Sequence, residues 1–239
     1  REQAFTARTP LGPKRMVNVQ GILPGRRDAA IALGAHYESK LYLNKRFVGA
    51  NDSASAVGVL LELARALASG PPEFTLWFLF FDGEEALLTW NADDSLYGSR
   101  RFVAELKRSN ALATLAAMIN LDMIGDAKLD VAREQRSTKW LRDLVWQAAA
   151  ELGYADAFAG PNIAIDDDHA PFLRAGIPAL DLIDYTYGGN ASPGSYWHTP
   201  GDRLDKLSRQ SLKIIGDTVL HSLPKIAARL GGASSAPRR

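Results

Sequence analysis

Hydrophobic positions along the chain fall into short, almost unbroken apolar runs separated by amphipathic stretches. The strongest run, residues 74–81 (FTLWFLFF), is typical of a strand buried on both faces, as in a parallel sheet. Apolar runs at 29–35, 115–121 and 177–183 predict three more buried strands, and a shorter one at 16–22 predicts an edge strand.

Helical spacing of apolar residues predicts helices that cover 57–67, 99–106, 141–152 and 207–230, the last one kinked at Pro224. Strands that alternate with helices indicate one α/β domain over 1–239, with a mostly parallel central sheet flanked by helices. Within it, residues 1–15 are expected to form an extended arm and residues 231–239 a flexible tail.

Polar residues follow four of the predicted strands. They are His36, the acidic cluster 82–85 (DGEE), Asp122 and, beyond a loop rich in Gly, Ser and Tyr, His198. Because the carboxyl ends of parallel strands meet at one edge of a sheet, where ligands bind in open α/β folds, we expect these residues to converge. Each of them alone is weak support for a site, and their convergence is the stronger argument.

Asp52 comes just before the predicted helix 57–67. By position, Asp52 or Ser53 could cap the N-terminus of that helix, so a ligand role for Asp52 needs support from elsewhere. The loop that carries it follows the strand 29–35, which would bring it to the same edge as His36.

Composition narrows the chemistry of such a site. The chain contains no cysteine and has a formal net charge of +1. A metal would therefore be held by His, Asp and Glu, a ligand set that suits zinc. The balanced charge argues against nucleic acid as a partner, and no apolar run is long enough to cross a bilayer.

Several motifs resemble those of the zinc-dependent glutaminyl-peptide cyclotransferases of the animal type, which share their fold with di-zinc aminopeptidases. The motifs are GANDSAS, FFDGEEA, WNADDSLYGSR, NLDMIG, DDHAPFL and WHT, and the resemblance covers about residues 16 to 225. It implies an enzyme that converts the N-terminal glutamine of peptides or proteins to pyroglutamate and releases ammonia.

The resemblance also implies roles for individual residues. The proposed zinc ligands are Asp52, Glu85 and His198, for one ion per chain; the catalytic residues are Glu84 as general acid/base, with Asp122 and Asp167; and the substrate-binding residues are Trp90, Trp197 and Ile165. The residues alone do not separate the roles of Glu84 and Glu85. A monomer that is secreted or periplasmic is expected.

Two alternatives remain open. A di-metal aminopeptidase would use Asp52 as a bridging ligand, with His36 and Asp122 on a second metal. A non-catalytic binding domain on the same scaffold is the other. The chain also departs from the resemblance, with Glu38 where the family usually has Asp, no disulfide, and a loop at 184–196 that is longer than in the animal pattern.

Overall fold

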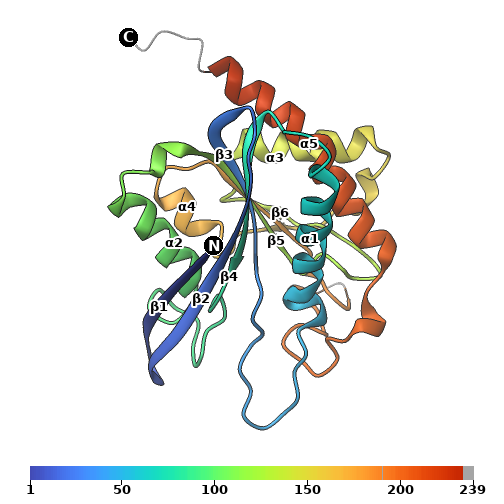
Figure 1. The fold of residues 1–239 in the computed structure, drawn as a ribbon. Coiled ribbons are helices and arrows are strands. Elements are labelled where there is room, and N and C mark those ends of the chain that lie inside the picture. Colours follow the sequence, from blue (N-terminus) through green and yellow to red (C-terminus); the bar gives the residue numbers. More distant parts are fainter. Residues whose placement is uncertain (190, 234–239) are drawn as a thin grey trace.

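The computed structural model describes residues 1–189 and 191–233. Within them, six strands form one sheet in the order β1–β2–β4–β3–β5–β8 (Figure 1). The strands are β1 (Glu2–Thr9), β2 (Gly12–Leu23), β3 (Arg27–His36), β4 (Phe74–Phe81), β5 (Leu115–Asp122) and β8 (Ala179–Ile183). Neighbours among β4, β3, β5 and β8 are parallel, whereas β1 and β2 add an antiparallel hairpin.

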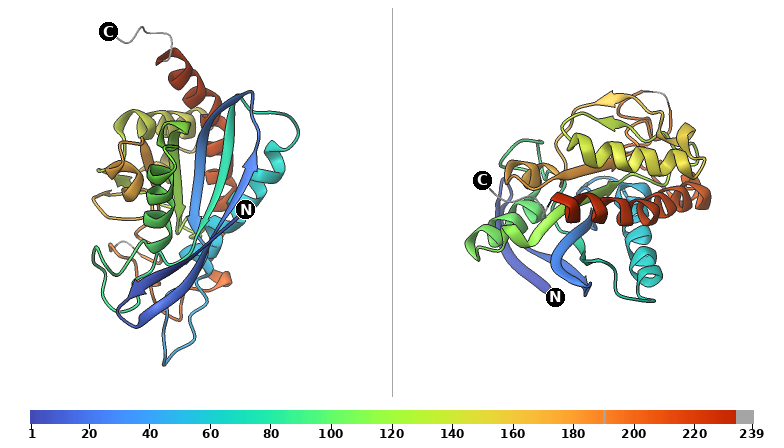
Figure 2. Two further views of the ribbon diagram at one scale, coloured as in Figure 1. Left: turned by 60° about the vertical axis from the view of Figure 1, so that its left-hand side comes forward. Right: turned by 90° about the horizontal axis from the view of Figure 1, so that it is seen from above.

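Helices cover both faces of this sheet (Figures 1 and 2). One face carries α1 (Ala56–Leu67), α3 (Lys139–Glu151) and α5 (Arg209–Ala233), and the other carries α2 (Tyr97–Arg108) and α4 (Ala170–Arg174). The short strands β6 (Arg133–Glu134) and β7 (Asn162–Ile163) pair with each other, and an irregular turn, η1 (Ala50–Ser55), precedes α1. The predicted α/β architecture with a central sheet flanked by helices is confirmed.

β4 shows why its sequence is apolar throughout. Phe74, Leu76 and Phe78 are buried in the core below α1, α3 and α5, whereas Leu79 and Phe81 are buried in the core below α2 and α4. Successive side chains of a strand point to opposite faces, so a strand between two helical layers needs apolar residues at every position. The predicted bounds of this strand agree with the observed ones.

The ends of the chain differ from expectation. Residues 1–15 are not an arm, because they form β1 and the first part of β2, and 16–22 therefore lies in an inner strand and not at the edge. Only one side chain of β1 is fully buried, which explains the weak apolar signal. At the other end, α5 continues through Pro224 to Ala233, so the predicted tail starts inside this helix, and residues 234–239 lie outside the described residues.

Candidate metal centre and adjoining cavity

The loops that leave the carboxyl ends of the strands gather at the lower end of the molecule in Figure 1. β3 is followed in sequence by β4, which pairs on one side of it, and later by β5, which pairs on its other side. Such a reversal of direction leaves a crevice beyond the strand ends, which is where open α/β sheets bind ligands. The predicted site residues come from these loops.

Asp52, Glu85 and His198 form a compact cluster. The Nε2 atom of His198 lies 2.7 Å from Glu85 Oε1 and 3.3 Å from Asp52 Oδ2. Ligand atoms from the three residues all lie within 4.8 Å of one another. Glu85 Oε1 and Asp52 Oδ2 are buried without a hydrogen-bond partner, a costly arrangement that a bound cation would relieve. Two carboxylates and an imidazole therefore fit a zinc ion.

Asp52 is held by its backbone. The Asp202 carboxylate accepts hydrogen bonds from the N–H groups of Asn51 (2.8 Å) and Asp52 (3.2 Å). The capping interpretation is wrong for both Asp52 and Ser53, because α1 starts at Ala56 and its N-cap residue makes no side-chain capping bond. The Asp52 carboxylate is thus free of the helix, and the neighbouring imidazoles of His36 and His198 hold its pKa below the usual range despite burial.

Glu85 is oriented by residues that follow β3. Its Oε2 atom lies 3.0 Å from the ammonium group of Lys40, and its backbone N–H donates to Glu38 Oε1 at 3.0 Å. One carboxylate oxygen is thereby tied to a cation, while the other faces His198. Glu38, at the position where the sequence departs from the family, supports this ligand through the backbone.

His198 is held in a strained conformation. Its φ angle is +54°, in the left-handed region that residues other than glycine rarely adopt. The carbonyl group of His198 accepts hydrogen bonds from the hydroxyl of Tyr42 (3.0 Å) and the ammonium of Lys45 (2.9 Å). The loop after β3 thus fixes the backbone of a residue 153 positions later than Lys45.

A second cluster shares Asp52. His36 Nε2 lies 3.2 Å from Asp52 Oδ1 and 3.4 Å from Asp122 Oδ1. Burial lowers the pKa of His36, but the carboxylates of Glu38, Asp122 and Asp52 outweigh it and raise the pKa well above its ordinary value. Burial raises the pKa of Asp122 to about 7, although His36 opposes this. The residues of the aminopeptidase alternative are therefore also together.

Glu84 is oriented differently from its neighbour Glu85. It is buried, and one of its carboxylate oxygens groups within 4.8 Å with ligand atoms of His36 and Glu38, whereas Glu85 groups with Asp52 and His198. Burial raises the pKa of Glu84 well above the ordinary value, opposed by His36 and assisted by Glu85, Asp167 and Asp168. The geometry thus distinguishes two adjacent glutamates that the residues alone do not separate.

A cavity of about 460 Å³ opens onto His198. Six of the predicted site residues line it, namely Trp90, Asp122, Ile165, Asp167, Trp197 and His198, together with Lys40, Met123, Asp166, Ile183 and Tyr185. The indole of Trp197 stacks on the His198 ring with centroids 3.7 Å apart, and Tyr185 meets Trp197 edge to face at 6.0 Å. Trp90 lies at the rim with 42% of its surface exposed. This aromatic pocket, with carboxylates in its wall, has the size of a small-ligand site and can take up an N-terminal residue.

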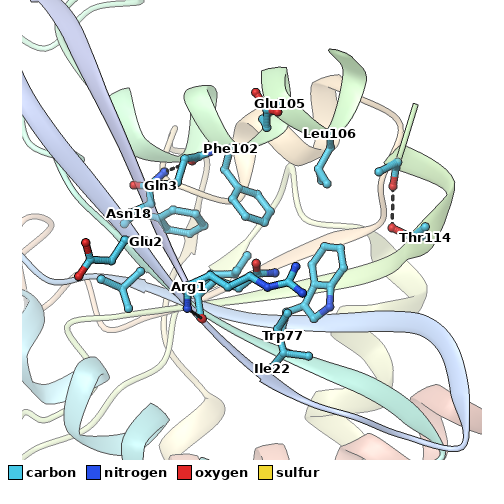
Figure 3. Close-up of a pocket in the computed structure, with 15 residues that line it drawn as sticks. Arg1, Glu2, Gln3, Asn18, Ile22, Trp77, Phe102, Glu105, Leu106 and Thr114 are labelled. Atoms are coloured by element: carbon cyan, nitrogen blue, oxygen red, sulfur yellow. Dashed lines mark hydrogen bonds between the residues drawn. The ribbon is translucent and has the colours of Figure 1, made fainter. Parts of the chain in front are cut away.

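Sequence reasoning did not single out Lys40, Tyr185 or Asp202 as functional. Lysines and tyrosines in loops are common, so nothing distinguished these residues before their partners were known. A separate cavity of about 320 Å³ lies between β1, β2, β4 and α2, where Trp77 meets Phe102 edge to face (Figure 3). It is lined by none of the predicted site residues.

The fold is that of the zinc aminopeptidases, and the chain belongs to peptidase family M28, whose model matches residues 18–223. The proteins to which this chain is similar include several glutaminyl cyclases. The crystal structure of the Acidobacteriales bacterium glutaminyl cyclase is 40% identical, covers 96% of this chain and 80% of that chain, and superposes with a TM-score of 0.92. The resemblance inferred from the motifs is thereby confirmed.

Two further relatives are less similar to this chain. The glutaminyl-peptide cyclotransferase-like protein of Mus musculus is 34% identical over 83% of this chain and 57% of its own length. A Zn-dependent exopeptidase from Parabacteroides distasonis is 28% identical, with a TM-score of 0.82 over 93% of this chain and 82% of that chain. This chain spans only 57–66% of the curated relatives. Zinc is the metal to which the family and the exopeptidase point. None of the helices in the described part of the chain is both long and apolar enough to cross a membrane.

Proposed function

We propose that the chain is a glutaminyl-peptide cyclotransferase, which closes the N-terminal glutamine of a peptide or protein to pyroglutamate and releases ammonia. The observation that carries the proposal is the aromatic cavity ending at His198, because it can enclose one N-terminal side chain next to a cation. The similarity to glutaminyl cyclases supports the same choice.

Asp52, Glu85 and His198 would hold one zinc ion. When bound, zinc would supply a Lewis acid for the γ-carbonyl group of the substrate. The protein's own side chains would bind and orient the substrate. The walls formed by Trp90, Trp197 and Ile165 would exclude water and hold the side chain in a folded conformer, so that the α-amine lies against its own carboxamide.

Glu84 would move the proton. It would accept one from the attacking α-amine and return it to the departing nitrogen, which leaves as ammonia. Asp122 and Asp167 line the cavity and would hold the substrate's amino group by hydrogen bonds. No water molecule needs to be activated for this reaction.

The first experiment is mass spectrometry of a peptide with N-terminal glutamine, incubated with the protein before and after zinc removal by a chelator. Loss of one ammonia that stops with the chelator and resumes with added zinc is expected. The Glu84→Gln variant should keep its zinc and lose about 10²–10⁴-fold in kcat. The exposed Glu62→Gln change serves as the control. Near-normal turnover of Glu84→Gln would remove Glu84 from the proposed role.

The second candidate is a di-metal aminopeptidase, which the His36–Asp52–Asp122 cluster favours. In the same assay it would release free glutamine instead of ammonia. Metal analysis would then find two ions per chain, whereas the proposed function expects one. A protein that bound no metal and changed no peptide would instead be a binding domain on this scaffold.

A monomer and export to the periplasm or the outside of the cell belong to the same proposal. Sedimentation of the purified protein and fractionation of the cells that make it test these two points.

A further inference from the structure

A second cavity adjoins the one that opens onto His198. It has a volume of about 310 Å³ and is lined by Trp90, Asn91, Ala92, Ser95, Leu96, Arg100, Asp166 and Arg174. Trp90 and Asp166 line both cavities. A chain that leaves the first cavity across the Trp90 rim therefore enters the second one directly.

The charged groups of this second cavity are predominantly positive. Arg100 is fixed in place, because its guanidinium donates to the carbonyl groups of Ala92 and Leu96 and lies 5.1 Å from the centre of the Tyr97 ring. Those partners are uncharged, so the charge of Arg100 is not neutralised by them.

Arg174 is the second cation of the wall. It is 55% exposed and lies 3.6 Å from Asp166, the one carboxylate that lines the cavity. Asp166 is engaged more closely by Arg136, at 2.7 Å. The single anion of this lining is thus shared between two arginines, and Arg100 forms no ion pair within the described part of the chain, so an additional carboxylate would be attracted here.

We propose that this cavity is a subsite for the peptide chain that follows the N-terminal glutamine, and that Arg174 and Arg100 make it favour an acidic side chain. The inference rests on the proposed function, since it needs a peptide whose first residue occupies the neighbouring cavity. A charged contact at an exposed rim acts equally on the bound substrate and on the transition state, so it should lower KM and leave kcat unchanged.

The test uses amidated peptides with N-terminal glutamine in an alanine background, carrying one glutamate at the second, third or fourth position. At one of these positions KM should be about twofold to fivefold lower than for the all-alanine peptide, with equal kcat, at low salt. The advantage should shrink as salt is raised, because exposed charges are screened. Equal KM values for all peptides at low salt would overturn the proposal.

Variants assign the effect to the cavity. Arg174→Gln should remove most of the preference for glutamate, and Arg174→Glu should replace it by a preference for lysine at the same position. Arg101→Gln is the matched control, because Arg101 is also exposed, pairs with Glu105 and does not line the cavity. A preference that survives in Arg174→Glu would place the acidic side chain elsewhere.

The all-alanine peptide distinguishes a failure of the proposed subsite from a failure of the proposed function. If it is cyclised but glutamate confers no advantage, the subsite is wrong and the proposed function stands. If no peptide is cyclised, the proposed function fails, and the subsite fails with it.

Discussion

The rim of the cavity depends on one buried carboxylate, which allows a quantitative test. Asp94 is 1% exposed and accepts hydrogen bonds from the N–H groups of Leu87 (2.9 Å), Leu88 (2.8 Å) and Thr89 (2.9 Å) and from the hydroxyl of Tyr97 (2.8 Å). Burial alone would raise the pKa of Asp94, but these donors lower it. The segment held in this way leads directly into Trp90.

Asp94→Asn replaces one of the two acceptor oxygens by an NH₂ group. In the better orientation of the new amide, its oxygen still accepts hydrogen bonds from the N–H groups of Leu88 and Thr89. The Tyr97 hydroxyl can turn to accept a hydrogen bond from the new NH₂ group, and the Leu87 N–H is left without a partner. A part-buried donor left unpaired costs about 1 kcal/mol, and two bonds weakened from charged to neutral cost about 1 kcal/mol each, so the held conformation should lose about 3 kcal/mol.

Most of this loss should appear as local opening of the 86–93 segment, because the segment is largely exposed. Amide hydrogen exchange at Leu87, Leu88 and Thr89 should become about a hundredfold faster, the factor that corresponds to about 3 kcal/mol. In the cyclisation assay KM should rise, because Trp90 loses its support, while zinc content stays unchanged.

Asp93→Asn is the control, since it removes the same charge one position earlier from an exposed residue. The reasoning is refuted if Asp94→Asn leaves exchange at these three amides equal to that of Asp93→Asn, whatever happens to activity.

Two further predictions concern the ligands and the fold. Lys40→Met removes the cation that holds Glu85, so zinc affinity should fall about tenfold to a hundredfold, as measured by competition with a chromophoric chelator; an unchanged Kd would contradict this role. Glu134 is buried, which disfavours its charge, but His169, the Arg136 N–H and Ser137 hold its pKa at about 2 in the folded chain, below the ordinary 4.5. Its stabilisation is therefore present above about pH 4.5 and is lost as the pH falls toward about 2. Glu134→Gln should cost about 2 kcal/mol near neutral pH in urea unfolding, a gap that narrows on acidification; a gap independent of pH would exclude the ionised group as its cause.

The parts of the fold that sequence predicts well are those whose side chains are buried on both sides. The bounds of 74–81 agree with β4 because every position except Thr75 packs under a helical layer, and β3, β5 and β8 also bury apolar residues on both faces. The hairpin of β1 and β2 was not predicted from the sequence, because its outer strand buries little apolar surface. Turn residues such as Gly12, with φ of +84°, occur both in extended arms and in hairpins, so they did not distinguish the two structures.

The pattern of apolar and polar residues predicted at which edge of the sheet the site lies, but not which side-chain atoms of the site lie next to each other. Convergence of His36, Asp122 and His198 follows from strand direction, which the apolar runs define. Which of Glu84 and Glu85 faces His198 depends on the rotation of two consecutive residues after Gly83, and no periodicity encodes that. The supporting contacts of Lys40 and Asp202 join segments far apart in the sequence, so they emerge only from the folded chain.

The position of His198 in the chain has a consequence for the order of folding. All six strands of the main sheet end before this residue, at Ile183 or earlier. On a ribosome the last proposed ligand is therefore made only after the complete sheet has been synthesised, and joining Asp52 to His198 closes a loop of well over a hundred residues. In zinc fingers the metal organises an otherwise unfolded peptide. Here the main hydrophobic core, which α5 completes after His198, contains none of the proposed ligands, so chelation should empty the site without unfolding the chain.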